Sequence, residues 1–519
     1  MEKKMTDVLR GYVWQDSKLL DPIPAGLFPE NCTPGGFAEI LTGLDGCFCV
    51  IIERGNFILA AVDRIRSYPL FYAVQNNELL ISDDAFELRS RLQDPAFDEA
   101  SLPEFLSTGI VSGNSTLYRD IKQLEAGQYL VWDKIAATLQ IGDHYVYRHV
   151  FGEENCDPAE LDKVHERVIG RLIASAQGRT LVIPLSGGHD SRLIAVMLKR
   201  LGYPKVICFT YGSSHLPECQ TSRKVAKFLN FPWLIVEQNR RMWFEAFHSE
   251  AMRRHFRYST HLSVSPHIQD WLAVRTLKER ALIPEDSLIV PGHSGDFPEG
   301  ANLPQIFEDM EEISERQLLN TIFERQFNLW YCPNDKRREL FAGRVRDYLG
   351  IPENQSAESA ASLFDFWDWR NREAKFIVNS VRVYEFFGYG WRLPLWDLEF
   401  LEFWRRVPLS GRMHQNLYQS YTRKYQYFLP ESSNNLTLEQ RIRKKYLSMQ
   451  FGHLTDPAYG RFLDYRNRSA YLNARVASFC LPNLPYPDFV NQELPVLNAD
   501  INGLQALIYI RELLSGRLD

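Results

Sequence analysis

The sequence predicts an α/β protein in two parts: an antiparallel, β-rich region over residues 1–148 and an α/β region with a parallel sheet over residues 149–519. In the first part, short apolar or alternating runs are separated by turn residues, a pattern typical of antiparallel strands. In the second part, short apolar runs alternate with helical stretches, which indicates parallel βαβ units with right-handed crossovers. From about residue 302 onward the pattern is mostly helical.

Four short runs in the first part are expected to be strands: Cys47–Glu53, Phe57–Val62, Leu70–Val74 and Leu79–Ser82. The segment Phe151–Pro158 that follows them is polar and carries a glycine and a proline. Such a segment is typical of a connection between structural units. We therefore expect the second part to begin there.

Strands and helices are expected to alternate in the second part. The predicted strands are Leu181–Leu185, Val206–Tyr211, Trp233–Val236 and Ser287–Val290, and the predicted helices between them are Ser191–Leu201 and Glu218–Leu229. Further along, Phe364, Phe366, Trp367 and Trp369 could stack on sugar rings. Aromatic side chains at these spacings are more often core residues, so we expect them to be buried.

The composition is that of an ordinary globular protein. Its 519 residues are 45% apolar and 24% charged, with a formal net charge of −6 and a pI near 6.1. This balance gives no electrostatic reason to expect nucleic-acid binding. No apolar run approaches the roughly 20 residues that cross a bilayer. The start, MEKKMTDVLRGYVWQ, lacks a signal-peptide core, and the eight cysteines show no metal-binding spacing, so we expect a cytoplasmic protein.

The turn between the first strand and the first helix of the second part reads PLSGGHDSR. Gly187 and Gly188 permit a tight backbone and the close approach of phosphate oxygens, and Ser186 offers a hydroxyl. The helix that follows points free N–H groups and a partial positive charge at such an anion. Asp190 would repel bare phosphate, so its expected role is to hold a bridging Mg²⁺ ion. The alternative, a plain strand-to-helix turn, explains the glycines but not the whole pattern.

This turn resembles the PP-loop of ATP pyrophosphatases, which cleave ATP to AMP and pyrophosphate, and it is not a Walker loop because no GKS or GKT follows. Further segments narrow the resemblance to the asparagine-synthetase branch. Asp63–Tyr72 is similar to DRxGxxPLYY and Arg392–Asp397 to RVPFLD. Three short segments resemble the run that links the family's two domains: Thr108–Val111, Thr116–Ile121 and Leu124–Gly127. The resemblance covers about residues 40–450 in the family's order.

The resemblance has consequences for fold and cofactors. It implies an Ntn-like, glutaminase-type domain over residues 1–148, and a PP-loop domain with a helical C-terminal extension over residues 149–519. It implies ATP and Mg²⁺ as cofactors. The residues that it places at the nucleotide are Ser186, Gly187, Gly188, Asp190, Ser191 and Gly292.

A second loop, Val290–Phe297, reads VPGHSGDF where asparagine synthetases show SGEGSDE and β-lactam synthetases GYGSD. Alignment on the aspartate implies that Asp296 is the second Mg²⁺ ligand. It puts His293 where the family needs a proton acceptor near the attacking amine, and an imidazole with a pKa near ~6.5 suits that task. The alternative is that His293 only hydrogen-bonds a loop carbonyl, in which case Tyr384 or Glu385 is the next candidate base.

The pyrophosphate leaving group needs a cation. The basic run Arg441–Lys445 stands where relatives carry an essential lysine, so the resemblance implies Lys444 or Lys445 without choosing between them. The alternative is a basic run on a solvated helix face. The stretch Tyr258–His267 falls where relatives place a substrate-side element. Its hydroxyls and histidines are candidate contacts for nucleotide or acyl substrate, although such clusters are common in loops.

The first part departs from the family's glutamine-using members, which begin with a cysteine whose free α-amine serves as base. Here Glu2 follows Met1, and the first cysteine is Cys32. The segments that hold glutamine in the family are not recognisable. We therefore expect a degenerate glutaminase-like domain that is a structural partner, with free ammonia or a substrate amine as the nucleophile.

The sequence thus predicts an AMP-forming carbon–nitrogen ligase that activates a small-molecule carboxylate as an acyl-adenylate and transfers the acyl group to ammonia or an amine. The wording LSGGHDSRLIAVMLKRLGY resembles asparagine-synthetase-like proteins of bacterial surface-polysaccharide clusters, which implies amidation of a uronic acid. The runner-up is an intramolecular cyclase of β-lactam or lasso-peptide type. A non-catalytic scaffold is disfavoured because Ser186, Asp190 and Asp296 are all present, and a tRNA thiolase because no cysteine pair flanks the loop.

Overall fold

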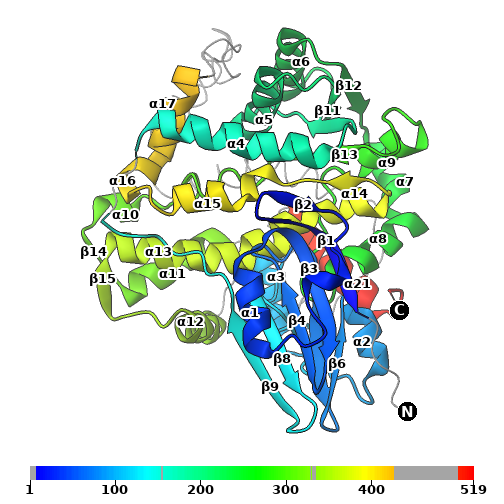
Figure 1. The fold of residues 1–519 in the computed structure, drawn as a ribbon, viewed down its shortest axis with the longest axis vertical. Helices are drawn as coiled ribbons and strands as arrows, with labels where there is room; N and C mark the ends of the chain where they lie inside the picture. The colour runs from blue at the N-terminus through cyan, green and yellow to red at the C-terminus, as the bar shows by residue number, and fades with distance from the viewer. Residues whose placement is uncertain (1–6, 153–155, 328, 330–334, 426–500, 519) are drawn as a thin grey trace.

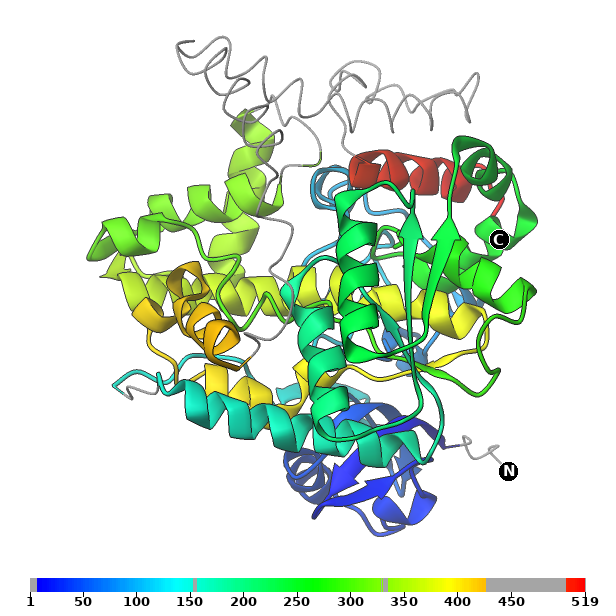
Figure 2. The same cartoon turned by 90° about the horizontal axis from the view of Figure 1, so that it is seen from above.

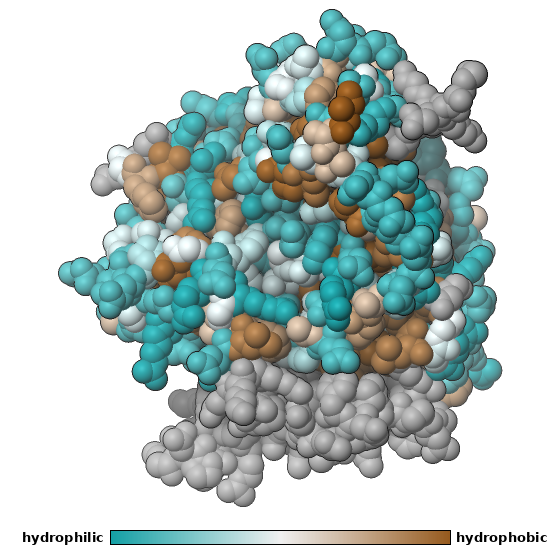
Figure 3. Space-filling model, turned by 90° about the horizontal axis from the view of Figure 1, so that it is seen from below, coloured by the Kyte–Doolittle hydropathy of each residue, from teal (hydrophilic) through white to brown (hydrophobic). Residues whose placement is uncertain are grey.

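The computed structural model describes residues 7–152, 156–327, 329, 335–425 and 501–518. Figure 1 draws an N-terminal unit, in blue, beside a larger unit of green and yellow elements. Lys444 and Lys445 lie outside the described residues. Within those residues no helix combines the length and apolar content needed to cross a bilayer. The face drawn in Figure 3 is largely hydrophilic, with apolar groups interrupted by polar side chains.

The N-terminal unit contains two antiparallel sheets, with strand orders β2-β1-β3-β4-β8-β9 and β6-β5-β7. The strands of the larger sheet are β1 (Val8–Gln15), β2 (Lys18–Leu20), β3 (Asp45–Arg54), β4 (Phe57–Val62), β8 (Gln128–Asp133) and β9 (Thr138–Asp143). Those of the smaller sheet are β5 (Phe71–Gln75), β6 (Glu78–Ser82) and β7 (Lys122–Gln123). The helices are α1 (Pro34–Thr42), α2 (Ala85–Arg91) and α3 (Ser101–Thr108).

Side-chain alternation along β3 positions these layers. Val50 and Ile52 belong to the core that includes α1, whereas Cys49 and Ile51 belong to the core shared with the second sheet. Both faces of the strand are therefore buried. The four strands predicted in this region are confirmed as β3, β4, β5 and β6, whereas β1 and β2 were not predicted.

The larger unit is built on a five-stranded sheet of order β12-β11-β10-β13-β16, in which all neighbours are parallel. The strands are β10 (Leu181–Pro184), β11 (Val206–Gly212), β12 (Trp233–Glu237), β13 (Leu288–Ile289) and β16 (Gly390–Trp391). Leu181 and Ile183 face a core that includes α4 (Pro158–Ala176) and α5 (His189–Arg200), while Val182 faces the opposite core. The predicted α/β class is confirmed.

Helices cover both faces of this sheet. Those that connect or flank the first strands are α6 (Pro217–Leu229), α7 (Arg240–Phe247), α8 (Glu250–Thr260) and α9 (Trp271–Glu279). The later elements are α10 (Ile306–Asp309), β14 (Glu312–Ser314), α11 (Glu315–Gln326), α12 (Asp335–Leu349), β15 (Asn354–Ser356), α13 (Ala357–Asp368), α14 (Arg382–Phe386), α15 (Leu398–Trp404), α16 (Leu409–Arg412), α17 (Asn416–Tyr425) and α21 (Ile501–Leu514). Figures 1 and 2 show α21, in red, against α3 of the N-terminal unit.

The segment between α13 and α14 departs from α-helical geometry. It forms a π-helical stretch, Trp369–Ile377, and then a 3₁₀ turn, Val378–Val381. π-Helical segments frequently occur at functional sites. The neighbouring Trp367 and Trp369 are buried in the core, as predicted. This segment therefore connects the core to the loops at the carboxyl edge of the parallel sheet.

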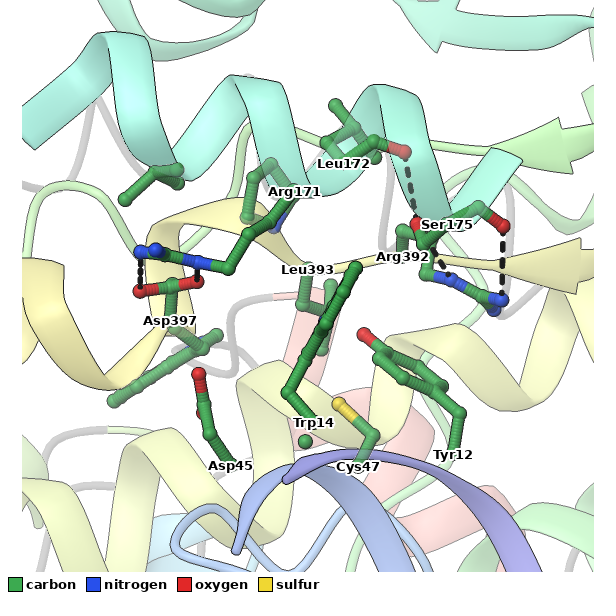
Figure 4. A pocket seen from close by; sticks show the side chains of 14 residues that line it. Tyr12, Trp14, Asp45, Cys47, Arg171, Leu172, Ser175, Arg392, Leu393 and Asp397 are labelled. Atoms are coloured by element: carbon green, nitrogen blue, oxygen red, sulfur yellow. Dashed lines mark hydrogen bonds and ion pairs between the residues drawn. The ribbon is translucent and has the colours of Figure 1, made fainter. Parts of the chain in front are cut away.

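The two units share a polar interface. Arg392 donates from Nη2 to Asp21 Oδ2 (2.7 Å) and from Nε to Ser175 Oγ of α4 (3.1 Å). Trp369 Nε1 donates to the carbonyl oxygen of Arg64 at 2.8 Å. Figure 4 shows Arg392 and Ser175 beside a cavity of about 40 Å³, which has room for ordered water. The N-terminal unit thus contacts the strand-to-loop segment that begins at Arg392.

Candidate active site

The loop after β10 is closed by its own hydroxyls. Ser186 N donates to Ser191 Oγ at 3.1 Å, and the two serine hydroxyls lie 3.2 Å apart. Gly188 N donates to Ser186 Oγ at 3.1 Å. No side chain caps α5, whose first turn begins after the exposed Gly188. The open N–H groups of that turn, together with the helix dipole, form a site suited to a phosphate oxygen.

The second loop lies directly against the first. A Cβ atom on Gly292 would stand 2.4 Å from Ser191 N, and one on Gly295 would stand 2.7 Å from Asp190 Cγ. Both contacts are too short for a side chain, so glycine is required at these two positions. The resemblance placed Gly292 at the nucleotide. In the structure it contacts the backbone that opens α5, and its contact with a nucleotide stays a prediction.

Three carboxylates meet where these loops touch. Asp190, Asp296 and Glu299 each offer an oxygen, and these oxygens lie within 4.8 Å of one another. Glu299 is fully buried, and its Oε1 has no hydrogen-bond partner, while Oε2 accepts from Gln415 Nε2 at 3.1 Å. Asp190 accepts from Tyr418 Oη at 3.2 Å. Sequence reasoning missed Glu299, although an acid three residues after Asp296 was a usable signal.

The mutual repulsion of these carboxylates favours the binding of a cation between them. Burial, and then the charges of Asp190 and Asp296, raise the pKa of Glu299 well above its ordinary value. Burial and Asp296 likewise raise the pKa of Asp190. An all-oxygen donor set with an unpartnered buried carboxylate oxygen fits Mg²⁺. The geometry therefore suits the two expected metal ligands and adds Glu299 as a third.

His293 contacts two serine side chains, and a hydrogen bond to its own backbone also acts on its ring. Its Nε2 lies 2.8 Å from Ser380 Oγ, in the 3₁₀ turn that precedes α14, and its Nδ1 lies 3.4 Å from Ser294 Oγ. Burial, with a smaller effect from His267, lowers the pKa of His293 to about 3. The expectation of a pKa near ~6.5 is therefore corrected: the ring is neutral at physiological pH. The sequence alone could not predict this lowered pKa, because the burial of the His293 ring comes from tertiary packing.

The two reserve candidates for the base lie on α14 and are engaged elsewhere. Tyr384 is fully buried beside Asp270, and the pKa of its hydroxyl is raised well above the ordinary value by that burial. Glu385 accepts from Tyr258 Oη and from Trp391 Nε1, each at 2.8 Å, and pairs with an arginine of its own helix. Neither carboxylate nor phenol is free in this structure to receive a proton.

Two arginines that sequence reasoning did not single out lie near the loops. Arg192 donates from Nη2 to the carbonyl oxygen of Gly187 at 3.0 Å, while its buried Nε has no partner. Arg372 pairs with Glu373. Burial raises the pKa of Asp296, and the charge of Arg372 offsets part of that rise. Lys444 and Lys445 lie outside the described residues, and Arg192 and Arg372 are two cations of the described part of the chain that act on these loops.

Comparison with known proteins agrees with this architecture. A glutamine amidotransferase domain model matches residues 32–145, and an asparagine synthase model matches residues 176–434. The chain is 24% identical over 310 residues to the carboxyethyl-arginine β-lactam synthase of Streptomyces clavuligerus. This match covers 57% of this chain and 55% of that protein.

Two further relatives match shorter segments. The microcin J25-processing protein McjC of Escherichia coli is 25% identical over 170 residues, 32% of this chain and 31% of its own. A probable glutamine-hydrolysing asparagine synthetase of Acanthamoeba polyphaga mimivirus is 28% identical over 206 residues, 37% of this chain and 35% of its own. The chain thus spans between about a third and about half of the length of these relatives. With both domain models matched in order on the expected fold, the chain belongs to the asparagine synthetase family.

Proposed function

We propose that the protein is an ATP-dependent ligase that activates a carboxylate as an acyl-adenylate with release of pyrophosphate, and then forms an amide with ammonia or an amine. The observation that carries the proposal is the uncapped start of α5 beside the carboxylate cluster Asp190–Asp296–Glu299. Together they provide hydrogen-bond donors for phosphate oxygens and oxygen ligands for Mg²⁺. Bound Mg²⁺ would neutralise the charge that develops on the leaving pyrophosphate.

The chain's own residues have distinct tasks in this reaction. The hydroxyl of Ser186 and the open N–H groups in the first turn of α5 hold phosphate oxygens and orient the α-phosphate toward the attacking carboxylate. Nε2 of His293 lies 2.8 Å from Ser380 Oγ, whereas Nδ1 has the longer contact, 3.4 Å to Ser294 Oγ, so Nδ1 is the ring nitrogen that would accept a hydrogen bond from the attacking amine. Its pKa is low in the protein alone. A bound anionic nucleotide would raise that pKa, because nearby negative charge favours the imidazolium.

The nitrogen source in this proposal is free ammonia or a substrate amine. Cys47 and Cys49 are buried within β3, where loss of solvent raises the pKa of both thiols far above the ordinary value. Cys32 is also buried, and burial raises its pKa. A thiol in this state is a poor nucleophile, since the thiolate is the reactive form. We propose that residues 1–148 act as a structural partner of residues 149–519.

The proposed acyl substrate is a sugar uronic acid, as the wording of the PP-loop segment suggests. A second candidate is intramolecular amide formation, which is favoured by the match to a β-lactam synthase over 310 residues. The two candidate reactions can be distinguished by assaying amide formation with a panel of uronic acids in the presence of ammonium. Intermolecular amidation gives amide product that depends on added ammonium, whereas a cyclase forms product from a single substrate that carries both the carboxylate and the amine.

The reaction class is tested by product analysis with ATP and Mg²⁺. AMP and pyrophosphate are expected, because the loop orients attack at the α-phosphate; ADP and phosphate would contradict the proposal. Asp296→Asn should reduce pyrophosphate release by about 100-fold or more, as expected for a lost metal ligand. Asp309→Asn, a change at an exposed carboxylate on α10, should leave it unchanged. Glutamate release from glutamine that is lost when Cys32, Cys47 or Cys49 is changed would overturn the assignment of the N-terminal unit.

A further inference from the structure

A large cavity lies between the N-terminal unit and the larger unit, away from the carboxylate cluster. Its volume is about 600 Å³, within the roughly 300–1,000 Å³ range of small-molecule sites. Its walls come from β1 and the loops before β5 and after β6 on one side, and from α8 and α14 on the other. The lining residues include Arg10, Arg254, Arg257, His261 and Arg382.

The arginines of this wall are not fully balanced by acids. Arg10 pairs with Asp83, and Arg257 lies 3.9 Å from Asp84. Arg254 contacts the ring of Phe386 and has no carboxylate partner among the described residues. The lining contains four guanidinium groups and two carboxylates, and Arg382 also pairs with Glu385 of its own helix. Positive charge therefore still exceeds negative charge around the cavity, which favours an anion.

Several donors on the wall have nothing to bind. Arg382 is almost fully buried, yet its Nε has no hydrogen-bond partner, and Nη1 of Arg257 is likewise buried and unpartnered. His261 is 8% exposed and stacks on Phe71, with its Nδ1 unpartnered. Buried polar atoms in native proteins are almost always hydrogen-bonded. Three such atoms, from two elements and one loop, belong to residues that line one cavity; because they have almost no accessible surface, they show unused hydrogen-bonding capacity in the wall and not direct contacts with a ligand.

The cavity also has flat apolar faces. Tyr68 lies on one side between Arg10 and Arg382, whose guanidinium carbons stand 5.4 Å and 5.1 Å from its ring centre. Tyr258 and Phe386 line the other side. Aromatic faces beside paired guanidinium groups suit a ligand that joins a ring to a phosphate, because guanidinium forks match phosphate oxygens.

We propose that this cavity binds a small cyclic molecule that carries a phosphate group. Arg382 lies two residues after Ser380, the partner of His293, so a ligand here lies next to the helix that borders the proposed active site. The phosphate-bearing ligand could be the ligase's own substrate or a separate effector. The first of these roles rests on the proposed function, whereas binding itself does not.

The test is calorimetric binding of glucose 1-phosphate to the purified protein in EDTA, where Mg²⁺-dependent nucleotide sites are silent. Glucose serves as the neutral comparison and inorganic phosphate as the ring-free one. Saturable binding of glucose 1-phosphate that is tighter than that of both comparisons is expected. The double variant Arg254→Gln/Arg257→Gln should weaken binding by about tenfold or more, since two charged donors are lost.

A matched control lies on the same helix. Arg253 of α8 pairs with Glu250 and does not line the cavity, so Arg253→Gln should bind glucose 1-phosphate like the parent protein. Asp296→Asn should also bind normally. Absence of saturable binding, or equal affinity in the double variant and the control, overturns the proposal. Failure to form AMP with any substrate would refute the ligase function and leave this binding result standing. Consumption of the phosphorylated ligand together with AMP formation would identify it as a substrate.

Discussion

Substituting Glu299 by glutamine tests the carboxylate cluster most directly. The side chain is fully buried, one oxygen has no partner, and the other accepts from Gln415. Glutamine has nearly the same shape and keeps an oxygen acceptor, so the change removes a charge with little effect on packing. Two opposite results should follow: the metal-free protein should become more stable, and the stabilisation by Mg²⁺ should be largely lost.

The magnitude comes from the separation of the charges. Oxygens of Glu299 and Asp190 lie within 4.8 Å of each other. Two unit charges at that distance repel by about 3.5 kcal/mol at an effective dielectric constant of ~20. Asp296 is exposed and screened, so it adds less. Partial protonation relieves some of the repulsion, so we expect Glu299→Gln to stabilise the metal-free protein by about 1–3 kcal/mol.

The assay is urea unfolding in EDTA and in excess Mg²⁺. At 100 times the dissociation constant, a ligand that binds only the folded state adds about 2.7 kcal/mol, and the variant should lose most of this gain. Glu311→Gln, at an exposed carboxylate before β14, is the control and should change neither value. If Glu299→Gln is less stable in EDTA than the parent, or gains as much from Mg²⁺, the cluster is not a metal site.

Three further changes test the packing and charges around the site. Gly295→Ala should lower pyrophosphate release by about 100-fold by displacing the metal carboxylate, while Gly343→Ala, where an added Cβ meets nothing within 4 Å, should not. Burial lowers the pKa of His165 to about 3. Between pH 6.5 and 3 only the unfolded chain takes up this proton, so the folded protein loses stability as the pH is lowered. Urea unfolding of His165→Phe should therefore show a stability that rises, relative to the parent, by about 1.4 kcal/mol for each pH unit of acidification. Arg171→Ala should cost about 2–3 kcal/mol in urea unfolding at neutral pH, because it leaves Asp397 buried without its two-bond partner, and the loss should shrink in acid.

The sequence was sufficient to predict a strand where the pattern of apolar residues is local. The strand at Phe57–Val62 has the bounds predicted from its apolar run, and β10 ends one residue before the predicted end. β1 was missed because its residues are mostly half-buried on both faces, which gives no clean alternation. β16 has only two residues and exists through its register with β13, a tertiary relation that no local pattern encodes.

The residues of the candidate site likewise fall into those that the sequence could indicate and those that depend on tertiary contacts. Asp190 was selected from the pattern of its loop and Asp296 from the resemblance to the family's second loop. The structure gives a physical reason why the two are close: the strands before these loops are neighbours in one parallel sheet, and the carboxyl ends of such strands share an edge. The lowered pKa of His293 could not be predicted, because it depends on tertiary packing that brings distant segments together, as the contact with Ser380, nearly ninety residues later, shows. Glu299 needed the partner Gln415 from a third segment to be recognised as buried.

A chain of contacts explains how the N-terminal unit can influence the site that it does not itself form. Asp21 binds Arg392, which follows β16 and continues into the loop that holds Leu395. A Cβ on Gly295 would stand 2.8 Å from Leu395 Cδ1 and 2.7 Å from Asp190 Cγ, so that leucine, the glycine and the metal carboxylate form one tight stack. Figure 4 shows the N-terminal side of this arrangement, with Tyr12 beside Arg392. Because close-packed groups transmit displacement instead of absorbing it, a shift of the first unit would move the carboxylate cluster. On the proposed function, a domain without glutaminase activity would therefore still have a physical reason to be present, because its contact with Arg392 holds one side of the segment that packs against the Gly295 loop.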